Sequence, residues 1–166
     1  MKIALCGFLG SGCTEVAEIL AGEFGLETYN TSRILKSIRN LDSLSRSGEI
    51  DIDEILKNKL EGRRKMDNII VEGRSAFMVL NRRDVIKIFL NCSSENRAKH
   101  VAERRGISIE DAKDDIRRSD EDRSQMFKRL FGKDCTDISN YDFTLNTNTK
   151  TYSKIAKIIA DIVKSL

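Results

Sequence analysis

The chain has 166 residues, which is the size of one domain and enough to bury about 70% of its unfolded surface. Its 29 Lys and Arg residues and 26 Asp and Glu residues are interleaved and give a formal net charge of +3, so no long basic block indicates a nucleic acid or an anionic membrane as partner. The first residues contain no apolar segment long enough for a signal peptide or a spanning helix, so we expect a cytoplasmic protein. The four cysteines form no C-x-x-C pair, which favours reduced thiols over disulfides or a zinc site.

Strand and helix signals alternate along the chain, with no proline, internal repeat or low-complexity linker to mark a second domain. The expected strands are 2–6, 26–29, 68–72, 85–90 and 143–146, most of them short apolar runs typical of buried parallel strands. Helical spacing of apolar residues predicts helices after residue 14 and over 32–38, 51–65 and 152–166. These elements predict an α/β fold, a doubly wound sheet of five parallel strands with helices on both faces. Ligands then bind at the carboxyl ends of the strands.

A phosphate-binding loop follows the first strand and precedes the first helix. The sequence Gly7-Phe8-Leu9-Gly10-Ser11-Gly12-Cys13-Thr14 fits G-x-x-x-x-G-K-[ST] except at Cys13. Glycines let such a loop curl into a nest of N–H donors at a helix N-terminus, where an anion is stabilised. The alternative, a turn with glycines for geometry only, is disfavoured by the three glycines, the following threonine and the strand–loop–helix context. The nucleotide-binding candidates here are Gly7, Gly10, Ser11, Gly12, Cys13 and Thr14.

Cys13 replaces the lysine whose positive charge usually follows the β- and γ-phosphates during phosphoryl transfer. A thiol cannot supply that charge, so another cation is needed if the chain is a catalyst. A cysteine at a helix N-terminus tends towards a lowered pKa, and bound phosphate should oppose this tendency. We therefore expect bound nucleotide to keep the thiol neutral and to protect it from alkylation.

The third strand ends in Glu72-Gly73-Arg74, which the fold places near Thr14. A carboxylate and a hydroxyl there predict a Mg²⁺ site formed by Thr14 and Glu72. The rigid fork of Arg74 suits a phosphate. A local salt bridge between Glu72 and Arg74 is the alternative, and the position beside the loop favours the functional interpretation.

Residues 97–129 are the most heavily charged stretch, and Gly106 separates two helical runs within it. Such a hairpin above a phosphate site predicts a lid that closes over nucleotides and excludes water. We expect at least two of its cations to face inward. The cations are Arg97, Lys99, Arg104, Arg105, Lys113, Arg117, Arg118, Arg123, Lys128 and Arg129, set against eight carboxylates. His100, the single histidine, is expected on the surface, and no Ser/His/Asp or Cys/His catalytic set is present.

Taken together, these blocks resemble the P-loop nucleoside monophosphate kinases, in particular the short archaeal type of cytidylate kinase. The resemblance covers most of the chain in order, although only the glycine loop and Glu72-Gly73-Arg74 are specific motifs. It implies one kinase domain over 1–166, with an acceptor-binding helical region at about 30–66 and the lid at about 97–129. It also implies that Arg74, and Arg118 with Asp122, bind the acceptor nucleotide and that Asn146 and Thr147 lie near the donor base. Lys36 occupies the position of a family arginine on the acceptor phosphate.

The implied reaction is transfer of the γ-phosphoryl group from ATP, with Mg²⁺, to a pyrimidine nucleoside monophosphate, with CMP or dCMP favoured. Lid arginines are the candidates for the missing catalytic cation, namely Arg104, Arg105 and Arg118. Two alternatives stay open: a non-catalytic nucleotide-binding or regulatory protein, and another P-loop small-molecule kinase such as one acting on dephospho-coenzyme A. The expected partners are small-molecule nucleotides, without nucleic acid or membrane, and the expected state is a monomer or weak dimer.

Overall fold

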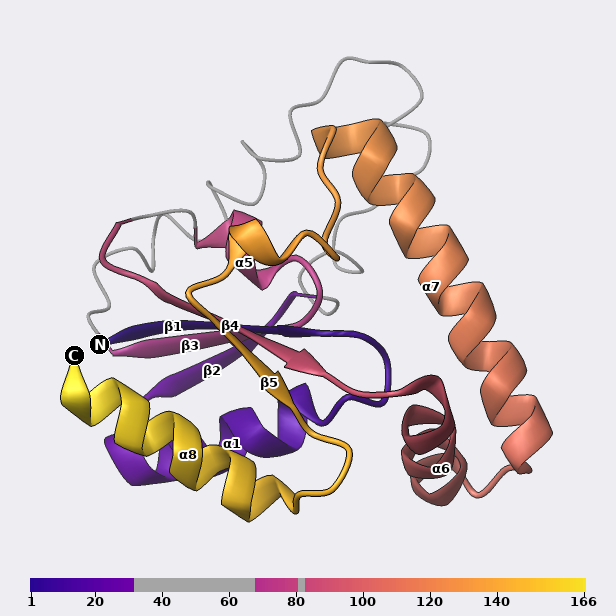
Figure 1. Cartoon of the computed structure of the whole chain (residues 1–166), viewed down its shortest axis with the longest axis horizontal. Coiled ribbons are helices and arrows are strands. Elements are labelled where there is room, and N and C mark those ends of the chain that lie inside the picture. The colour runs from indigo at the N-terminus through magenta and orange to yellow at the C-terminus, as the bar shows by residue number, and fades with distance from the viewer. Residues whose placement is uncertain (32–67, 81–82) are drawn as a thin grey trace.

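A computed structural model describes residues 1–31, 68–80 and 83–166. The described residues form a five-stranded parallel sheet with the strand order β2-β3-β1-β4-β5 (Figure 1). The strands are β1 (Lys2–Gly7), β2 (Glu27–Asn30), β3 (Ile69–Glu72), β4 (Ile86–Asn91) and β5 (Phe143–Asn146). The α/β fold with five parallel strands, as predicted from the sequence, is confirmed.

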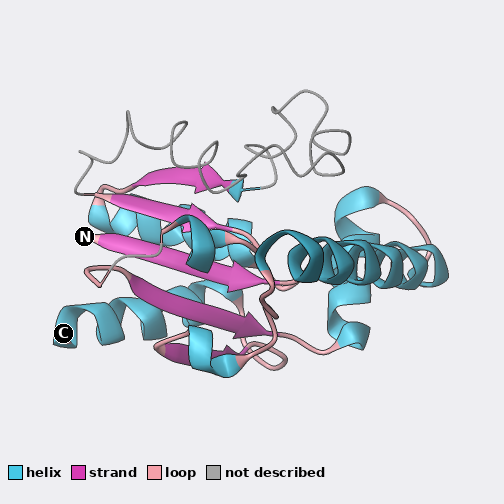
Figure 2. Ribbon diagram, turned by 90° about the horizontal axis from the view of Figure 1, so that it is seen from above, coloured by secondary structure: helices cyan, strands magenta, loops and turns pink. Residues whose placement is uncertain are grey.

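Helices cover both faces of this sheet (Figure 2). The helices of the described residues are α1 (Cys13–Phe24), α5 (Ala76–Val79), α6 (Ser94–Arg105), α7 (Ile109–Phe131) and α8 (Tyr152–Ser165), of which α1 and α8 lie on one face of the sheet and α5 on the other. Strand β1 supplies both sides of the core, because successive side chains of a strand point to opposite faces. Ile3 and Leu5 pack with α1 and α8, whereas Ala4 and Cys6 pack with α5. None of the described helices is long and apolar enough to cross a membrane.

Most boundaries lie within one residue of those expected, and β2 shows why they shift. The N–H of Leu26 donates to the carbonyl of Ala21 at 3.0 Å, after Gly25 has turned into the left-handed region with φ 64°. Leu26 therefore completes the C-terminal cap of α1, and β2 begins at Glu27. The short helix α5 and a 3₁₀ turn at Ile138–Asn140 were not expected, since neither is long enough to show an apolar period. The predicted helices at 32–38 and 51–65 lie outside the described residues.

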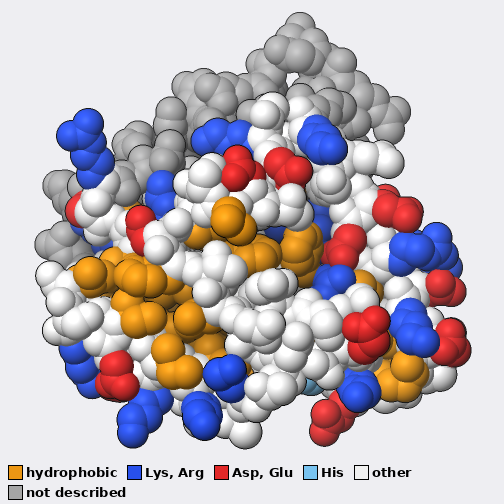
Figure 3. Space-filling model, viewed as in Figure 1, with side chains coloured by type: hydrophobic (Ala, Val, Ile, Leu, Met, Phe, Trp, Pro, Cys, Tyr) orange, Lys and Arg blue, Asp and Glu red, His pale blue; other side chains and the backbone are white. Residues whose placement is uncertain are grey.

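Helices α6 and α7 form the expected hairpin at the carboxyl end of the sheet (Figure 1). Gly106 ends α6 with φ 65°, and the hydroxyl of Ser108 accepts from the N–H of Asp111 at 3.0 Å to start α7. The hairpin has its own small apolar core, formed by Ala98, Val101, Ala102, Ala112 and Ile116. On the face seen in Figure 3, acidic and basic side chains are interspersed over this hairpin.

Candidate active site

A cavity of about 510 Å³ lies at the carboxyl ends of β1 and β3, beneath the helical hairpin. Its walls come from the glycine loop, from the ends of β2 and β3, and from α6 and α7. The lining residues are Gly7, Phe8, Leu9, Gly10, Gly12, Cys13, Thr14, Glu15, Asn30, Thr31, Glu72, Gly73, Arg74, Ser75, Arg104, Arg105, Asp115, Ser119, Asp122, Arg123 and Phe127. The cavity therefore brings together residues that lie more than a hundred positions apart in the chain.

The glycine loop adopts a conformation that depends on its glycines. Gly12 has φ 89°, and a Cβ there would lie 2.5 Å from Cε1 of Tyr152. At Gly7 a Cβ would collide with the Ser11 hydroxyl and the Cys13 sulfur. Ser11 is buried beneath the loop, where its hydroxyl donates to the Phe8 carbonyl at 2.8 Å. The loop thus presents backbone to the cavity, as binding of phosphate by N–H groups requires.

Cys13 is buried, with 8% of its surface exposed, and its sulfur lies 3.5 Å from the Ser11 hydroxyl. Burial raises the pKa of the Cys13 thiol to about 12, and nearby Glu72 acts in the same direction, although the Ser11 hydrogen bond lowers it. The expected tendency towards a lowered pKa at a helix N-terminus is therefore overturned, because desolvation dominates. All four cysteines are free and buried, as expected for reduced thiols.

This burial predicts slow alkylation of Cys13. Iodoacetamide reacts with the thiolate, and a pKa near 12 leaves little thiolate at pH 7.5, so labelling should be far slower than in the denatured chain, where the pKa returns to about 8.5. The rate should rise about tenfold per pH unit between pH 7 and 9, and saturating ATP should lower it further. Cys6 and Cys13 share the tryptic peptide 3–33, so tandem mass spectrometry, which locates the label within a peptide, is needed to measure Cys13 by itself. Labelling that ATP leaves unchanged would contradict a phosphate position over Cys13.

A hydroxyl, an amide and a carboxylate side chain meet in the wall of the cavity. The Thr14 hydroxyl donates to Oε1 of Glu72 at 3.1 Å, and the Asn30 amide donates to the same oxygen. Glu72 is 4% exposed. In the part of the chain that the structure describes, no three His, Cys, Asp or Glu side chains group closely enough to hold a metal ion. A hydroxyl and one carboxylate instead fit Mg²⁺, which takes few protein ligands and completes its shell with water and phosphate oxygens.

Arg74 lines the same cavity and is 9% exposed. Its Nη1 donates to the Ser119 carbonyl at 3.0 Å and its Nη2 to Asp120 at 2.8 Å, so its ion pair is with α7. The alternative of a local surface bridge to Glu72 does not describe this buried arginine. Burial lowers the pKa of Arg74, and the adjacent Asp120 carboxylate raises it again.

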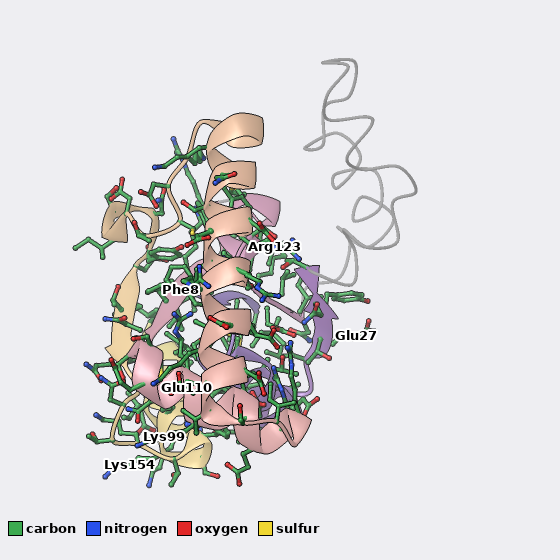
Figure 4. All side chains as sticks on the ribbon, turned by 90° about the vertical axis from the view of Figure 1, so that its right-hand side faces the viewer. Phe8, Glu27, Lys99, Glu110, Arg123 and Lys154 are labelled. Atoms are coloured by element: carbon green, nitrogen blue, oxygen red, sulfur yellow. The ribbon has the colours of Figure 1, made fainter. Side chains whose placement is uncertain are left out.

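Two of the lid arginines expected from the sequence reach the cavity. Arg104 lies 3.7 Å from Glu15 at the start of α1, and Arg105 pairs with Asp115. Arg123, one of the ten cations of the hairpin, also lines the cavity, and Figure 4 labels it on α7. The expectation that at least two lid cations face inward is therefore confirmed.

Arg118 does not reach this cavity. It is exposed on α7, and the described residues of α7 that line the cavity follow a different stripe: Asp115, Ser119, Asp122, Arg123 and Phe127. Residue 118 falls outside this stripe because each residue of an α-helix turns by about 100°. The structure thus brings Asp122 to the cavity and leaves Arg118 outside it.

The remaining predicted positions lie elsewhere or outside the described residues. Asn146 is exposed, and Thr147 is buried with its hydroxyl on the Asn91 carbonyl at 3.3 Å, so both lie at the end of β5 and neither lines the cavity. Lys36 lies outside the described residues. His100 is half-buried rather than on the surface: its Nδ1–H donates to the Gly10 carbonyl at 2.9 Å, which supports the loop.

Sequence reasoning missed the network around Phe8. Arg97 donates to both oxygens of Asp120, at 2.6 and 3.2 Å, and the guanidinium carbons of Arg74 and Arg97 lie 4.7 and 5.2 Å from the Phe8 ring centroid. The available signal was weak, since Arg97 and Asp120 are two of many charges on polar helices and Phe8 is a variable position of the loop motif.

The sequence profile of the cytidylate kinase-like family matches residues 41–149. The chain belongs to this family. The match includes Glu72, Arg74 and the whole α6–α7 hairpin, which contribute to the wall of the cavity. The glycine loop lies before the matched range and is covered instead by whole-chain relatives.

Archaeal proteins named cytidylate kinase are similar to this chain over most of their length. The cytidylate kinase of Methanopyrus kandleri is 32% identical over 163 residues, covering 88% of this chain and 84% of that protein. That of Thermoplasma acidophilum is 28% identical over 179 residues, covering 100% of this chain and 94% of that protein. The resemblance found in the sequence is confirmed, and the chain is a member of a kinase family.

Solved structures confirm the P-loop kinase fold. An uncharacterized protein from Eubacterium ventriosum aligns with a TM-score of 0.79 at 18% identity, covering 100% of this chain and 99% of that one. A shikimate kinase from Acinetobacter baumannii aligns with a TM-score of 0.60 at 17% identity, covering 99% and 93%. At this identity the likeness concerns the fold alone.

Proposed function

We propose that the protein is a nucleoside monophosphate kinase that transfers the γ-phosphoryl group of ATP to CMP or dCMP. The observation that carries the proposal is the joint placement of the glycine loop, the Thr14–Glu72 pair and Arg74 around one cavity. A loop for the donor phosphates and a buried arginine for a second anion are what transfer between two nucleotides requires. The names of the archaeal relatives support a pyrimidine acceptor.

Phosphoryl transfer to a phosphate acceptor needs positioning and charge more than acid–base chemistry, because the attacking oxygen is already anionic. The N–H groups of the glycine loop would hold the donor phosphates, and Thr14 and Glu72 would hold Mg²⁺. When bound, Mg²⁺ supplies positive charge to the phosphate oxygens. Arg74 would fix the acceptor phosphate, with Asp122 on the acceptor side. Asn146 and Thr147 remain candidates for a site next to the donor base.

The missing lysine charge would come from the hairpin. Arg104, Arg105 and Arg123 line the cavity, and Arg104 contacts Glu15 in the first turn of α1. An arginine that reaches the transferring group stabilises its developing charge. The hairpin α6–α7 would act as a lid, and its closure would bring these guanidinium groups to the phosphates and exclude water.

A second candidate is a nucleotide-binding protein without catalysis, and the observation that favours it is Cys13. A buried neutral thiol at the lysine position leaves the loop able to bind phosphate but removes a catalytic charge. Arg74 favours the catalytic interpretation. A protein that only binds ATP does not need a buried arginine in the cavity wall for a second anion.

The deciding experiment measures ADP formation from ATP and Mg²⁺ with CMP, dCMP, UMP and AMP as acceptors. It uses the native chain and Cys13→Lys, with ATP binding measured separately by calorimetry. Turnover of CMP or dCMP by the native chain is the expected result. Activity in Cys13→Lys alone would mean that the scaffold is competent but lacks its cation. No ADP formation in either variant, with ATP still bound, would overturn the proposed function and favour the non-catalytic alternative.

A further inference from the structure

Asp120 has no role in the reaction as proposed, yet it lies at the centre of the most heavily buried charge cluster of the described residues. Its two carboxylate oxygens accept three hydrogen bonds, from Nη2 of Arg74 at 2.8 Å and from Nη2 and Nη1 of Arg97 at 2.6 and 3.2 Å. The two arginines are 9% and 6% exposed, respectively. One carboxylate thus joins an arginine of the cavity wall to an arginine of the hairpin.

Asp120 binds Arg74 on the side that faces away from the cavity. Arg74 lines the cavity that also contains the glycine loop, whereas Asp120 and Arg97 line a separate groove on the other side of α7 with Ile116. Of the five N–H donors of Arg74, one on Nη1 and one on Nη2 are bound by Ser119 and Asp120. Among the described residues the other donors have no such partner, so they remain for a ligand in the cavity.

The cluster also carries an excess of positive charge, which suits the binding of an anion. Two guanidinium groups share one carboxylate and contact the face of the Phe8 ring, so the group carries one net positive charge in a desolvated place. Arg97 is anchored to the glycine loop, since its Nη1 also donates to the Leu9 carbonyl at 3.4 Å. The buried Nε of Arg97 has no hydrogen-bond partner among the described residues, so the printed contacts of its guanidinium are those of Nη1 and Nη2.

We propose that Asp120 is a positioning residue that holds the Arg74 guanidinium against the cavity and couples acceptor-phosphate binding to the packing of the hairpin on the glycine loop. The inference rests on the proposed function, because it assigns Arg74 to the acceptor. Asp120 does not compete with the acceptor, since it does not reach the cavity. It acts by fixing the direction of the fork, on which two-point binding of a phosphate depends.

The test is Asp120→Asn, which keeps the shape but places an amide where a carboxylate faces two guanidinium groups. The KM for the nucleoside monophosphate should rise by about ten- to a hundredfold while the KM for ATP stays within about twofold. KM does not depend on the fraction of folded enzyme, so a merely structural defect would not produce this split. Asp120→Glu, which restores the charge, should recover part of the acceptor affinity.

Asp114→Asn is the matched control, because Asp114 is exposed on the same helix and pairs with Arg117 at 3.1 Å. It should leave both KM values unchanged. If Asp120→Asn does not fold, Asp120→Glu is measured instead: it keeps the charge but moves the carboxylate by one methylene, so it should show the same split at a smaller size. Equal changes in both KM values, or a lower acceptor KM, would overturn the inference. If the native chain binds no nucleoside monophosphate in calorimetry, the proposed function fails instead.

Discussion

Arg74→Lys is expected to lower kcat/KM for the nucleoside monophosphate by about 10²–10³-fold, with little change in the affinity for ATP. Lysine keeps the charge but has one donor centre, so it cannot bind Ser119, Asp120 and a phosphate together as the planar fork can. Most of the loss should appear in the acceptor KM. Steady-state kinetics with each substrate varied in turn measures the split.

Arg117→Lys is the matched control for that substitution. Arg117 lies on α7, is exposed and pairs with Asp114, so losing its fork should change neither constant. A fall in ATP affinity as large as that in acceptor affinity would show that Arg74 serves the donor or the fold as a whole. Thermal unfolding of both variants shows whether Arg74→Lys destabilises the fold, which separates a general loss of stability from a specific loss of acceptor binding.

The sheet could be predicted from the sequence because each of its determinants is local. Runs such as Ile69–Glu72 are apolar at nearly every position, which a strand covered on both faces requires, and the glycine loop carries its own motif. The order of the strands, β2-β3-β1-β4-β5, was not predicted, because right-handed crossovers and short connections restrict the topology without fixing it. Even the one-residue shift at Leu26 has a local cause, the cap of α1 at Gly25.

The direction of the charged side chains could not be predicted in the same way. Helix α7 is polar over most of its surface, so no apolar stripe announces which face meets the site. Asp120 and Asp122 differ by two positions, which places them about 200° apart on the helix, and only the tertiary structure decides that Asp122 lines the cavity and Asp120 holds Arg74. Likewise, only the tertiary structure decides that Arg123 lines the cavity and Arg118 does not.

Cys13 shows the limit of the motif itself. Its position at a helix N-terminus suggested a thiol with a lowered pKa. The burial of the thiol has the larger effect on its pKa, and the motif does not specify how deeply the side chain is buried. Burial raises the pKa of the Cys13 thiol to about 12, so the thiol packs within the loop as a neutral side chain rather than acting as a nucleophile. Under the proposed function, one of the arginines of the cavity must therefore supply the positive charge that Cys13 lacks.

Arg104→Met is expected to lower kcat at saturating substrates by about 10²–10³-fold in the native background and by less than about tenfold in Cys13→Lys. Arg104 stands in the last turn of α6, lines the cavity and lies 3.7 Å from Glu15 in the first turn of α1, so it is a lid cation that contacts the helix that begins at Cys13. A lysine at position 13 supplies that charge from below and makes the arginine partly redundant. The double-mutant cycle measures this dependence as a coupling between the two positions.

Lys99→Met on the same helix provides the control, since Lys99 is exposed and carries its charge outside the cavity lining (Figure 4). It should leave kcat unchanged in both backgrounds. Equal losses for Arg104→Met in the two backgrounds would mean that Arg104 acts independently of position 13 and that Arg105 or Arg123 supplies the cation. The same cycle with Arg123→Met then discriminates between those two, because a true replacement for the lysine must become dispensable once the lysine is restored.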